Sequence, residues 1–453
     1  MDHPRSKLPA VLAILFCIAL LGGVGVLLWK TLPEKQQPQQ AETIQTDSVF
    51  SSEQTAVEPE REAPYEGELP EQAEAAQPEQ PDSEQPSEPA ADPAAPDDAP
   101  VTDAQKTAQA TLASMTEDEK LWQLFFVTPE AITNVNTATV AGEATKNALA
   151  QYPVGGIVYF AKNLEDRAQA AALLANTQSY AKIPLFLGVD EEGGTVSRIG
   201  ANEALGGTKV ADMRSFGQSA DPAQVYAAGQ TLAANLTGLG FNLDFAPDCD
   251  VVSGVDSVIG SRSVGSDPEL CASRAGVIVK SLRAEGVVSC LKHFPGYGSA
   301  TVDDHNGTSI VEKTLDELES CDLVPFQSII AQEGSVPFVM VTHLSYPNVT
   351  GSDTPADLSS AIVTDILRDK LGYQNVIITD SQSMSSITDH YSAGEAAVQA
   401  LAAGCDMILM PSDLQGAFDA VKAAVADGTL TQSRIDESVL RILTVKAEYG
   451  ILQ

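Results

Sequence analysis

The feature that most constrains the fold is a series of eight short apolar segments spread along residues 102–453. Most are continuous apolar runs and do not alternate with polar residues, as expected for strands that are buried on both faces. The eight candidate strands are Leu121–Val127, Val154–Phe160, Pro184–Asp190, Phe241–Pro247, Val287–His293, Pro337–His343, Asn375–Asp380 and Cys405–Met410.

Amphipathic stretches with helical spacing separate these runs. The predicted helices are Glu165–Tyr180, Pro222–Leu239, Pro268–Glu285, Leu315–Gln332, Glu395–Ala403, Leu414–Ala426 and Gln432–Tyr449. Eight strands that alternate with helices predict an α/β fold, a (β/α)8 TIM-type barrel. A doubly wound open sheet is the alternative.

Two segments of different character precede this domain. Residues 1–31 contain an uncharged apolar run, Leu8–Trp29, which is long enough to cross a bilayer and follows Arg5 and Lys7. We expect a cytoplasmic tip and a transmembrane signal anchor that binds the membrane and leaves the rest of the chain outside the cytoplasm. The alternative is a secreted protein whose signal is cleaved.

Residues 32–101 are rich in Pro, Glu, Gln, Ala and Ser and hold few large apolar side chains. Such a segment buries too little surface to offset the entropy of ordering, so we expect a disordered linker. It serves either as a stalk that holds residues 102–453 away from the membrane or as a plain tether.

Charge and cysteine content exclude some classes of function. The chain of 453 residues carries a net charge of -36, which disfavours nucleic acid as a partner. The cysteines after residue 31 show no spacing typical of a metal site. Fingerprints of nucleotide-binding, zinc-protease and serine-hydrolase sites are missing from the sequence as well. No metal and no cofactor is expected.

Charged or imidazole side chains stand at the ends of most of the apolar runs. They are Asp190, Asp248, Asp250, Lys292, His293, His343 and Asp380. Because the carboxyl ends of barrel strands meet at one rim, these side chains are expected to converge on one site. Carboxylates with cationic partners at a barrel mouth suit the binding and cleavage of sugars.

The segment after Leu291, KHFPGYGSATVDDH, combines two histidines with glycines, a proline and two aspartates. Its composition favours a rigid loop that presents polar side chains. Asp303 and His305 are two residues apart, so in an extended loop they point the same way. A carboxylate beside an imidazole suits a general acid/base; binding of a cation by the loop is the alternative.

This segment resembles the KHFPGHGDTxxDSH signature of bacterial β-N-acetylhexosaminidases of glycoside hydrolase family 3. The similarity continues through MTEDEKLWQLF, GGIVYF, GVDEEGGTVSRI, FNLDFAPDCDV, SRSVGSDP, MVTHLSYP and VIITDSQSM, in this order. The chain ends soon after the last predicted helix, which favours the single-domain hexosaminidase subgroup over the β-glucosidases.

The resemblance implies a role for each matching residue. Asp380 is expected to be the nucleophile that forms a covalent glycosyl-enzyme, and His305, oriented by Asp303, the acid/base. Residues expected to bind the N-acetylglucosamine ring are Asp190, Arg262, Lys292, His293 and His343. The implied activity is retaining, exo-acting hydrolysis of terminal β-N-acetylglucosaminides, with cell-wall glycan fragments as substrates and no cofactor.

The sequence also departs from the family pattern, at Thr195, Val264, Tyr297, Ser299, Ala300, Ser381 and Gln382. None of these positions carries a proposed catalytic residue, but several are expected to reshape the pocket. Two other functions stay open. One is a related enzyme of other specificity, a β-glucosidase or an N-acetylglucosaminide phosphorylase. The other is a non-catalytic surface protein that binds sugar.

Overall fold

The computed structural model describes residues 101–453 except 218–220, 253–256, 301–308 and 333–335. The predicted anchor, 1–31, and the predicted linker, 32–101, lie outside the described residues apart from Val101, so both stay predictions. Within the part of the chain that is described, no helix combines the length and apolar character needed to cross a membrane.

Eight parallel strands form a closed barrel, as the alternation of apolar runs predicts. Around the barrel they follow the order β1-β10-β9-β8-β7-β6-β3-β2. β1 pairs with both β10 and β2, so the sheet has no edge and the open doubly wound alternative is wrong. Their bounds are β1 Phe125–Val127, β2 Gly156–Val158, β3 Phe186–Val189, β6 Leu243–Asp244, β7 Val288–Phe294, β8 Phe338–Val341, β9 Val376–Ser381 and β10 Met407–Leu409.

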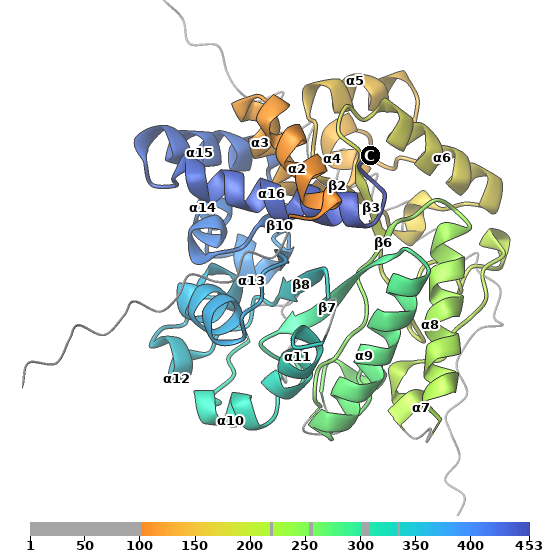
Figure 1. Ribbon diagram of the computed structural model, residues 1–453, viewed down its shortest axis with the longest axis vertical. Helices are drawn as coiled ribbons and strands as arrows, with labels where there is room; N and C mark the ends of the chain where they lie inside the picture. Colours follow the sequence, from red (N-terminus) through yellow and green to blue (C-terminus); the bar gives the residue numbers. More distant parts are fainter. Residues whose placement is uncertain (1–100, 218–220, 253–256, 301–308, 333–335) are drawn as a thin grey trace, which may run out of the picture. The chain divides into compact units, whose positions relative to one another are not determined.

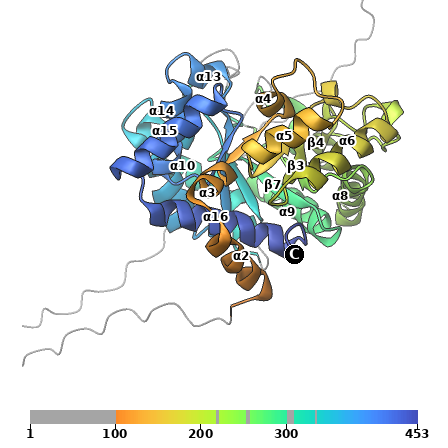
Figure 2. The same cartoon turned by 90° about the horizontal axis from the view of Figure 1, so that it is seen from above.

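Helices surround the strands, and neighbouring helices lie side by side, as α8 and α9 do (Figure 1). Figure 2 gives a second view of the same arrangement, with α16 beside α3. The longer helices are α2 Asp103–Ser114, α5 Glu143–Gln151, α6 Arg167–Tyr180, α8 Pro222–Thr237, α9 Pro268–Ala284, η6 Ala361–Lys370, α14 Ala393–Ala403, α15 Leu414–Asp427 and α16 Gln432–Glu448. The shorter ones are α3 Glu117–Gln123, α4 Pro129–Thr133, α7 Met213–Gly217, α10 Leu315–Ser320, α11 Leu323–Ile330, α12 Pro347–Thr350 and α13 Ser385–Thr388.

Two predicted elements differ in the structure. The run Leu121–Val127 is helical in its first half, because Thr116 and Glu119 form a capping box that starts α3, which continues to Gln123. The predicted helix Leu315–Gln332 is divided into α10 and α11. Pro325 lacks an amide proton and fits only the first turn of a helix, so a new helix begins just before it.

Aromatic side chains fill the barrel where two strands carry glycine. A Cβ atom on Gly156 would lie 2.5 Å from the ring of Phe126, and one on Gly188 would lie 2.9 Å from the rings of both Phe126 and Phe245. The rings of Phe126 and Phe245 pack edge to face with centroids 5.2 Å apart. The glycines thus make room for aromatic packing at the centre of the barrel.

At the amino-terminal end of the barrel, α16 places a lysine in the core. Lys446 is fully buried, its Nζ donates to Gln123 Oε1 at 2.8 Å, and it lies 5.1 Å from the centroid of the Phe186 ring. In the described part of the chain no carboxylate lies within 4.0 Å of this amine. Burial lowers the pKa of Lys446 from 10.5 to about 7.

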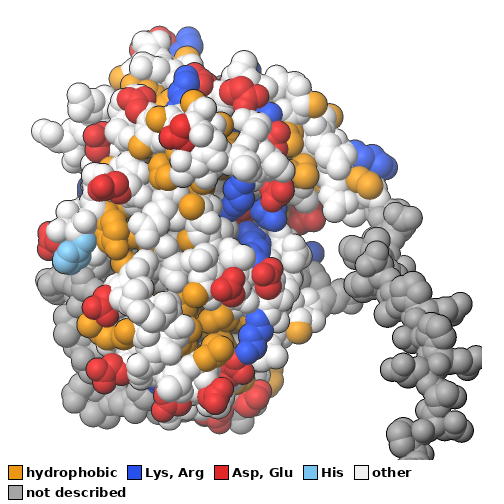
Figure 3. Space-filling model, turned by 90° about the vertical axis from the view of Figure 1, so that its left-hand side faces the viewer, with side chains coloured by type: hydrophobic (Ala, Val, Ile, Leu, Met, Phe, Trp, Pro, Cys, Tyr) orange, Lys and Arg blue, Asp and Glu red, His pale blue; other side chains and the backbone are white. Residues whose placement is uncertain are grey.

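The acidic composition of the chain is visible on the surface of the structure (Figure 3). On the face shown in Figure 3, acidic side chains are scattered over the surface and lie in between the basic ones.

Candidate active site

A cavity of about 640 Å³ opens where the strands end. Polar and apolar side chains line it together, which is typical of sites for small ligands. Five of the residues predicted from the sequence line this cavity: Asp190, Arg262, Lys292, His293 and Asp380. Apolar side chains on its wall include Phe160, Val258, Met384 and Met410. The convergence expected from the strand ends is therefore found in the structure.

An irregularity in β7, where the peptide bond between Lys292 and His293 is cis, brings these two consecutive residues to the cavity. In a regular strand, neighbours such as Lys292 and His293 point to opposite faces. Here the pairing of β7 with β8 shifts register between Leu291 and Phe294, and both Lys292 and His293 line the cavity. The irregular segment therefore directs both side chains to the same cavity.

A buried carboxylate, Glu192, holds the two cationic side chains of the site together. Lys292 Nζ lies 2.7 Å from Glu192 Oε1, and Arg262 donates two hydrogen bonds of 2.9 Å to the same carboxylate. Burial alone would raise the pKa of Glu192, but the charges of Lys292 and Arg262 outweigh it and lower the pKa to about 2. Lys292 also donates to Asp190 Oδ1 at 2.9 Å. The pair of cations is thus fixed and stays charged.

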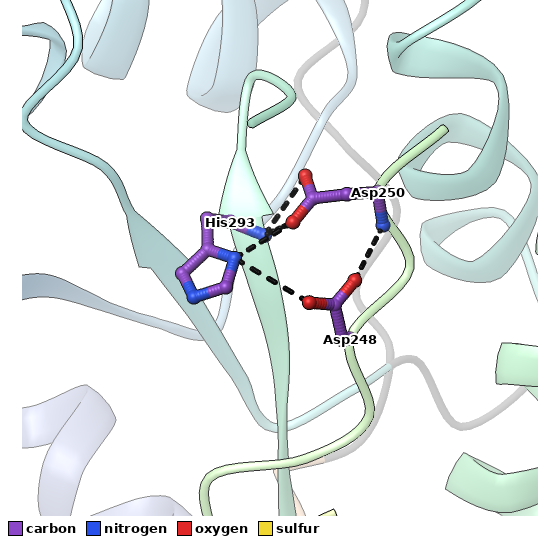
Figure 4. Close-up of side chains that lie close together, drawn as sticks. All are labelled: Asp248, Asp250 and His293. Carbon is purple, nitrogen blue, oxygen red and sulfur yellow. Dashed lines mark hydrogen bonds and ion pairs between the residues drawn. The ribbon is translucent and has the colours of Figure 1, made fainter. Parts of the chain in front are cut away.

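His293 is oriented by two aspartates from the segment after β6 (Figure 4). Its Nδ1 lies 2.7 Å from Asp250 Oδ2 and 3.9 Å from Asp248 Oδ2. The charge of Asp250 outweighs burial and raises the pKa of His293. Burial and the charge of Asp250 raise the pKa of Asp248 to about 7, so this carboxyl group takes up a proton near neutral pH.

The same three side chains are of the types that bind metal ions, with ligand atoms within 4.8 Å of one another. Ligand atoms that share one tetrahedral zinc ion lie about 3.4 Å apart, since each bond is about 2.1 Å. The Nδ1 to Oδ2 distance of 2.7 Å is that of a hydrogen bond. Arg262 lies 3.5 Å from Asp248 and supplies positive charge. The geometry therefore favours a hydrogen-bonded ion-pair network.

Asp380 lies in β9 and is the carboxylate best placed to react. Its Oδ1 accepts a hydrogen bond of 2.7 Å from the backbone N–H of Ser381. Among the described residues, no basic side chain forms an ion pair with it within 4.0 Å. Burial would raise the pKa of Asp380, but the nearby charges of His293 and His343 lower it. Asp380 is thus an ionised carboxylate that forms no direct ion pair with the described residues.

His343 does not lie where the sequence suggested. It is fully buried and is not one of the residues that line the cavity in the described structure. Its Nε2 lies 2.9 Å from the backbone oxygen of Ser381, and its Nδ1 lies 3.0 Å from Asp357 Oδ1. In the described structure His343 therefore lies behind the nucleophile segment and away from the cavity wall, while its expected contact with the sugar stays a prediction.

Sequence reasoning missed two charged residues that line the cavity, Glu192 and Arg198. Glu192 follows Asp190 by two residues, so strand alternation was a signal that both face the same side. Arg198 is brought back by the hairpin of β4 Glu191–Gly193 and β5 Val196–Ser197. Glu191 fixes this turn by accepting hydrogen bonds from the backbone of Arg198, Ile199 and Gly200 at 2.7 to 2.8 Å.

The proposed acid/base pair lies outside the described residues. Asp303 and His305 fall within 301–308, so their expected roles stay predictions. The neighbouring segment is described as far as Ala300, and Tyr297 at its start lines the cavity. Tyr297 donates its backbone N–H to Asp250 Oδ1 at 2.6 Å, which anchors the beginning of the loop.

Gln382, one of the departures from the family pattern, is buried without an evident reason. Only 1% of it is exposed, and neither polar atom of its side chain has a hydrogen-bond partner in the described structure. We expect Gln382→Leu to stabilise the protein by about 1–3 kcal/mol, because burial of an unpaired amide is costly. Thermal unfolding measures this effect, with the exposed Gln415→Leu as the matched control. A lower unfolding temperature for Gln382→Leu would contradict the prediction.

The chain matches the family model described as "Glycosyl hydrolase family 3 N terminal domain" over residues 116–445. It is 33% identical over 329 residues to "Beta-hexosaminidase A" of Pseudoalteromonas piscicida, which covers 66% of this chain and 54% of that protein. This chain thus spans about half the length of that relative. It is 38% identical over 273 residues to "Beta-hexosaminidase LpqI" of Mycobacterium tuberculosis, which covers 58% of this chain and 68% of that protein.

A solved structure has the same fold. A glycoside hydrolase family 3 β-N-acetylglucosaminidase from Paenibacillus sp. str. FPU-7 superimposes with a TM-score of 0.70 and 34% identity, covering 75% of this chain and 63% of that one. The family match spans most of residues 102–453, including every strand of the barrel and all five predicted residues that line the cavity. The chain therefore belongs to glycosyl hydrolase family 3.

Proposed function

We propose that this protein is a retaining, exo-acting β-N-acetylhexosaminidase that removes terminal β-N-acetylglucosamine. The observation that carries the proposal is the cavity that Asp380 lines together with Asp190, Arg262, Lys292 and His293 from other strand ends. Similarity to relatives named as β-hexosaminidases supports the choice of sugar. The depressed pKa of Asp380 supports a carboxylate that is ionised at neutral pH, as a nucleophile must be.

The proposed reaction has two displacement steps. Asp380 attacks the anomeric carbon as the bond to the leaving oxygen breaks, and His305, held by Asp303, donates a proton to that oxygen. His305 then takes a proton from water, which attacks the anomeric carbon and releases Asp380. Each step inverts the anomeric centre, so the product keeps the β configuration.

The charged network around the cavity supports recognition of sugar hydroxyls. Asp190 accepts hydrogen bonds, and Lys292 and Arg262 donate them, in an arrangement that Glu192 fixes. A network that is already held in place loses little entropy when the sugar binds. In this proposal Asp190, Arg262, Lys292 and His293 bind the hydroxyls of the N-acetylglucosamine ring.

The natural substrate is proposed from location. If residues 1–31 anchor the chain and residues 32–101 act as a stalk, the catalytic domain lies outside the cytoplasm. Cell-wall glycan fragments that contain N-acetylglucosamine are then the substrates within reach. The proposed reaction uses the carboxylate and the imidazole alone and takes no step through a cofactor.

Turnover of aryl glycosides tests the proposal. We expect the full-length protein to release the aryl group from an aryl β-N-acetylglucosaminide and not from the β-glucoside, with β-N-acetylglucosamine as the first sugar product. Faster release of the aryl group from the β-glucoside would indicate that the protein is a β-glucosidase. A sugar phosphate that forms when phosphate is added would indicate a phosphorylase, an alternative that the cationic Arg198, Arg262 and Lys292 in the cavity make reasonable. Sugar binding without turnover would indicate a binding protein.

A further inference from the structure

His343 occupies an unusual position between two hydrogen-bond acceptors. Its Nε2 lies 2.9 Å from the backbone oxygen of Ser381, which accepts and does not donate. Its Nδ1 lies 3.0 Å from Asp357 Oδ1, a contact within ion-pair distance that does not have the geometry of a hydrogen bond. The contact with Ser381 O requires a proton on Nε2, and the contact with a carboxylate favours a second proton on Nδ1. The distances therefore suit a doubly protonated ring.

The pair of Asp357 and His343 is buried away from solvent. Both residues are 0% exposed, and in the described part of the chain His343 is the only basic side chain within 4.0 Å of the Asp357 carboxylate. A buried carboxylate needs a nearby cation, since an unpaired buried charge is costly. Asp357 is held in place by its own backbone N–H, which donates to Thr342 O at 3.2 Å.

The pair connects to the nucleophile through Ser381. The carbonyl oxygen of Ser381 accepts the hydrogen bond from His343, while its N–H donates to Asp380 Oδ1 at 2.7 Å. The backbone on both sides of Ser381 is thus fixed, on one side by the buried ring and on the other by the reacting carboxylate. A change at His343 is therefore expected to move the peptide that orients Asp380.

Other ionisable groups surround this arrangement from the packed elements. Against the effect of burial, the charges of His293, His343 and Lys292 act on Asp380, which lies in β9, and lower its pKa. Burial, together with the charge of Asp357, raises the pKa of Cys405 and that of Tyr391. None of these groups except His343 forms an ion pair with Asp357 in the described structure, so His343, when protonated, is the side chain placed to balance this carboxylate.

We infer that Asp357 and His343 form a positioning pair for the nucleophile, in which an imidazolium holds the Ser381 peptide and keeps a positive charge behind Asp380. This role concerns the same site and rests on the proposed function, in which Asp380 is the nucleophile. In this role His343 does not touch the sugar and is not a catalytic residue. It acts through Ser381, and Asp357 acts through His343.

The protonation state tests the pair without any assay of activity. In full-length protein labelled with ¹⁵N-histidine, the five histidines of the chain give a short list of ring signals, and His343→Gln identifies the signal of His343. We expect both ring nitrogens of His343 to carry protons from pH 6 to pH 8. A ring with one unprotonated nitrogen in this range would overturn the inference.

Kinetics test the positioning role. We expect His343→Gln and Asp357→Asn to lower kcat by about a hundredfold, as small displacements of reacting groups do, while KM changes little because the sugar contacts remain. Loss of the charge also raises the pKa of Asp380, so the acid limb of the pH profile moves to higher pH. The exposed His390→Gln is the matched control and is expected to match wild type in both respects.

Outcomes separate the two proposals. If wild-type protein cleaves no aryl glycoside, the proposed function fails, and the ¹⁵N signals still decide whether His343 is an imidazolium. If wild type is active but His343→Gln loses only stability, with kcat and the acid limb unchanged, the pair is merely structural and the inference is overturned.

Discussion

Replacing Asp380 with asparagine is expected to lower kcat on an aryl β-N-acetylglucosaminide by at least about a thousandfold. An amide has nearly the same shape as the carboxylate but is a poor nucleophile, and loss of a nucleophile removes the covalent route altogether. The fold is expected to survive, since no basic side chain in the described structure forms an ion pair with Asp380. Steady-state kinetics with a thermal unfolding curve measure both effects.

A second variant identifies the role of Asp380. In Asp380→Ala the removed side chain leaves space beside the anomeric carbon, and added azide is expected to occupy it and attack the carbon directly. The product is then the α-glycosyl azide, with the opposite configuration to that of hydrolysis. Asp389→Asn, an exposed aspartate close to the cavity segment, is the matched control. Full activity of Asp380→Asn would refute the nucleophile assignment.

The second large effect is on stability, at the opposite end of the barrel. We expect Lys446→Met to stabilise the protein by several kcal/mol at neutral and acidic pH. Lys446 is fully buried and lacks a carboxylate partner among the described residues, so holding its charge in the folded state is costly. At about 1.4 kcal/mol per pH unit, the difference between 10.5 and a pKa of about 7 corresponds to about 5 kcal/mol.

Part of this expected stabilisation is offset by the loss of the hydrogen bond between Lys446 and Gln123. The side chain of Gln123 accepts the hydrogen bond from Lys446 through Oε1 and donates to Pro153 O at 2.7 Å. In Lys446→Met the Oε1 atom stays buried without a donor, which costs about 1–3 kcal/mol. The net stabilisation expected at pH 7 is therefore about 2–4 kcal/mol. Thermal unfolding of the variant beside wild type measures it.

The stabilisation by Lys446→Met is expected to depend on pH. The pKa of Lys446 is lower in the folded than in the unfolded chain, so the unfolded chain binds more protons between about pH 7 and 10.5. The destabilisation is fully present below about pH 7 and disappears as the pH rises toward 10.5. The advantage of Lys446→Met should shrink over that range, while the exposed Lys146→Met shows no such trend. A variant less stable than wild type at pH 7 would contradict the assignment.

The sequence predicts the barrel and the general place of the site, for reasons that can be traced to particular residues. The eight strands are buried on both faces, so each one can be recognised in the sequence as a continuous apolar run. Asp190, Lys292 and Asp380 stand at strand ends, and parallel strands end at one rim whatever the details of packing. The predicted start of the first strand was wrong because the capping box of Thr116 and Glu119 starts a helix there. The predicted helix Leu315–Gln332 was incomplete because it is divided into α10 and α11 near Pro325.

The sequence by itself determined the alternation of strands and helices, the family pattern, and five residues that line the cavity. Only the tertiary structure decided how side chains are aimed and paired. The irregular segment of β7 turns both Lys292 and His293 to the cavity, Glu192 binds two cations from distant segments, and His343 points away toward Asp357. The direction of a side chain depends on the register between strands that are far apart in the chain, and a one-dimensional pattern does not contain that register.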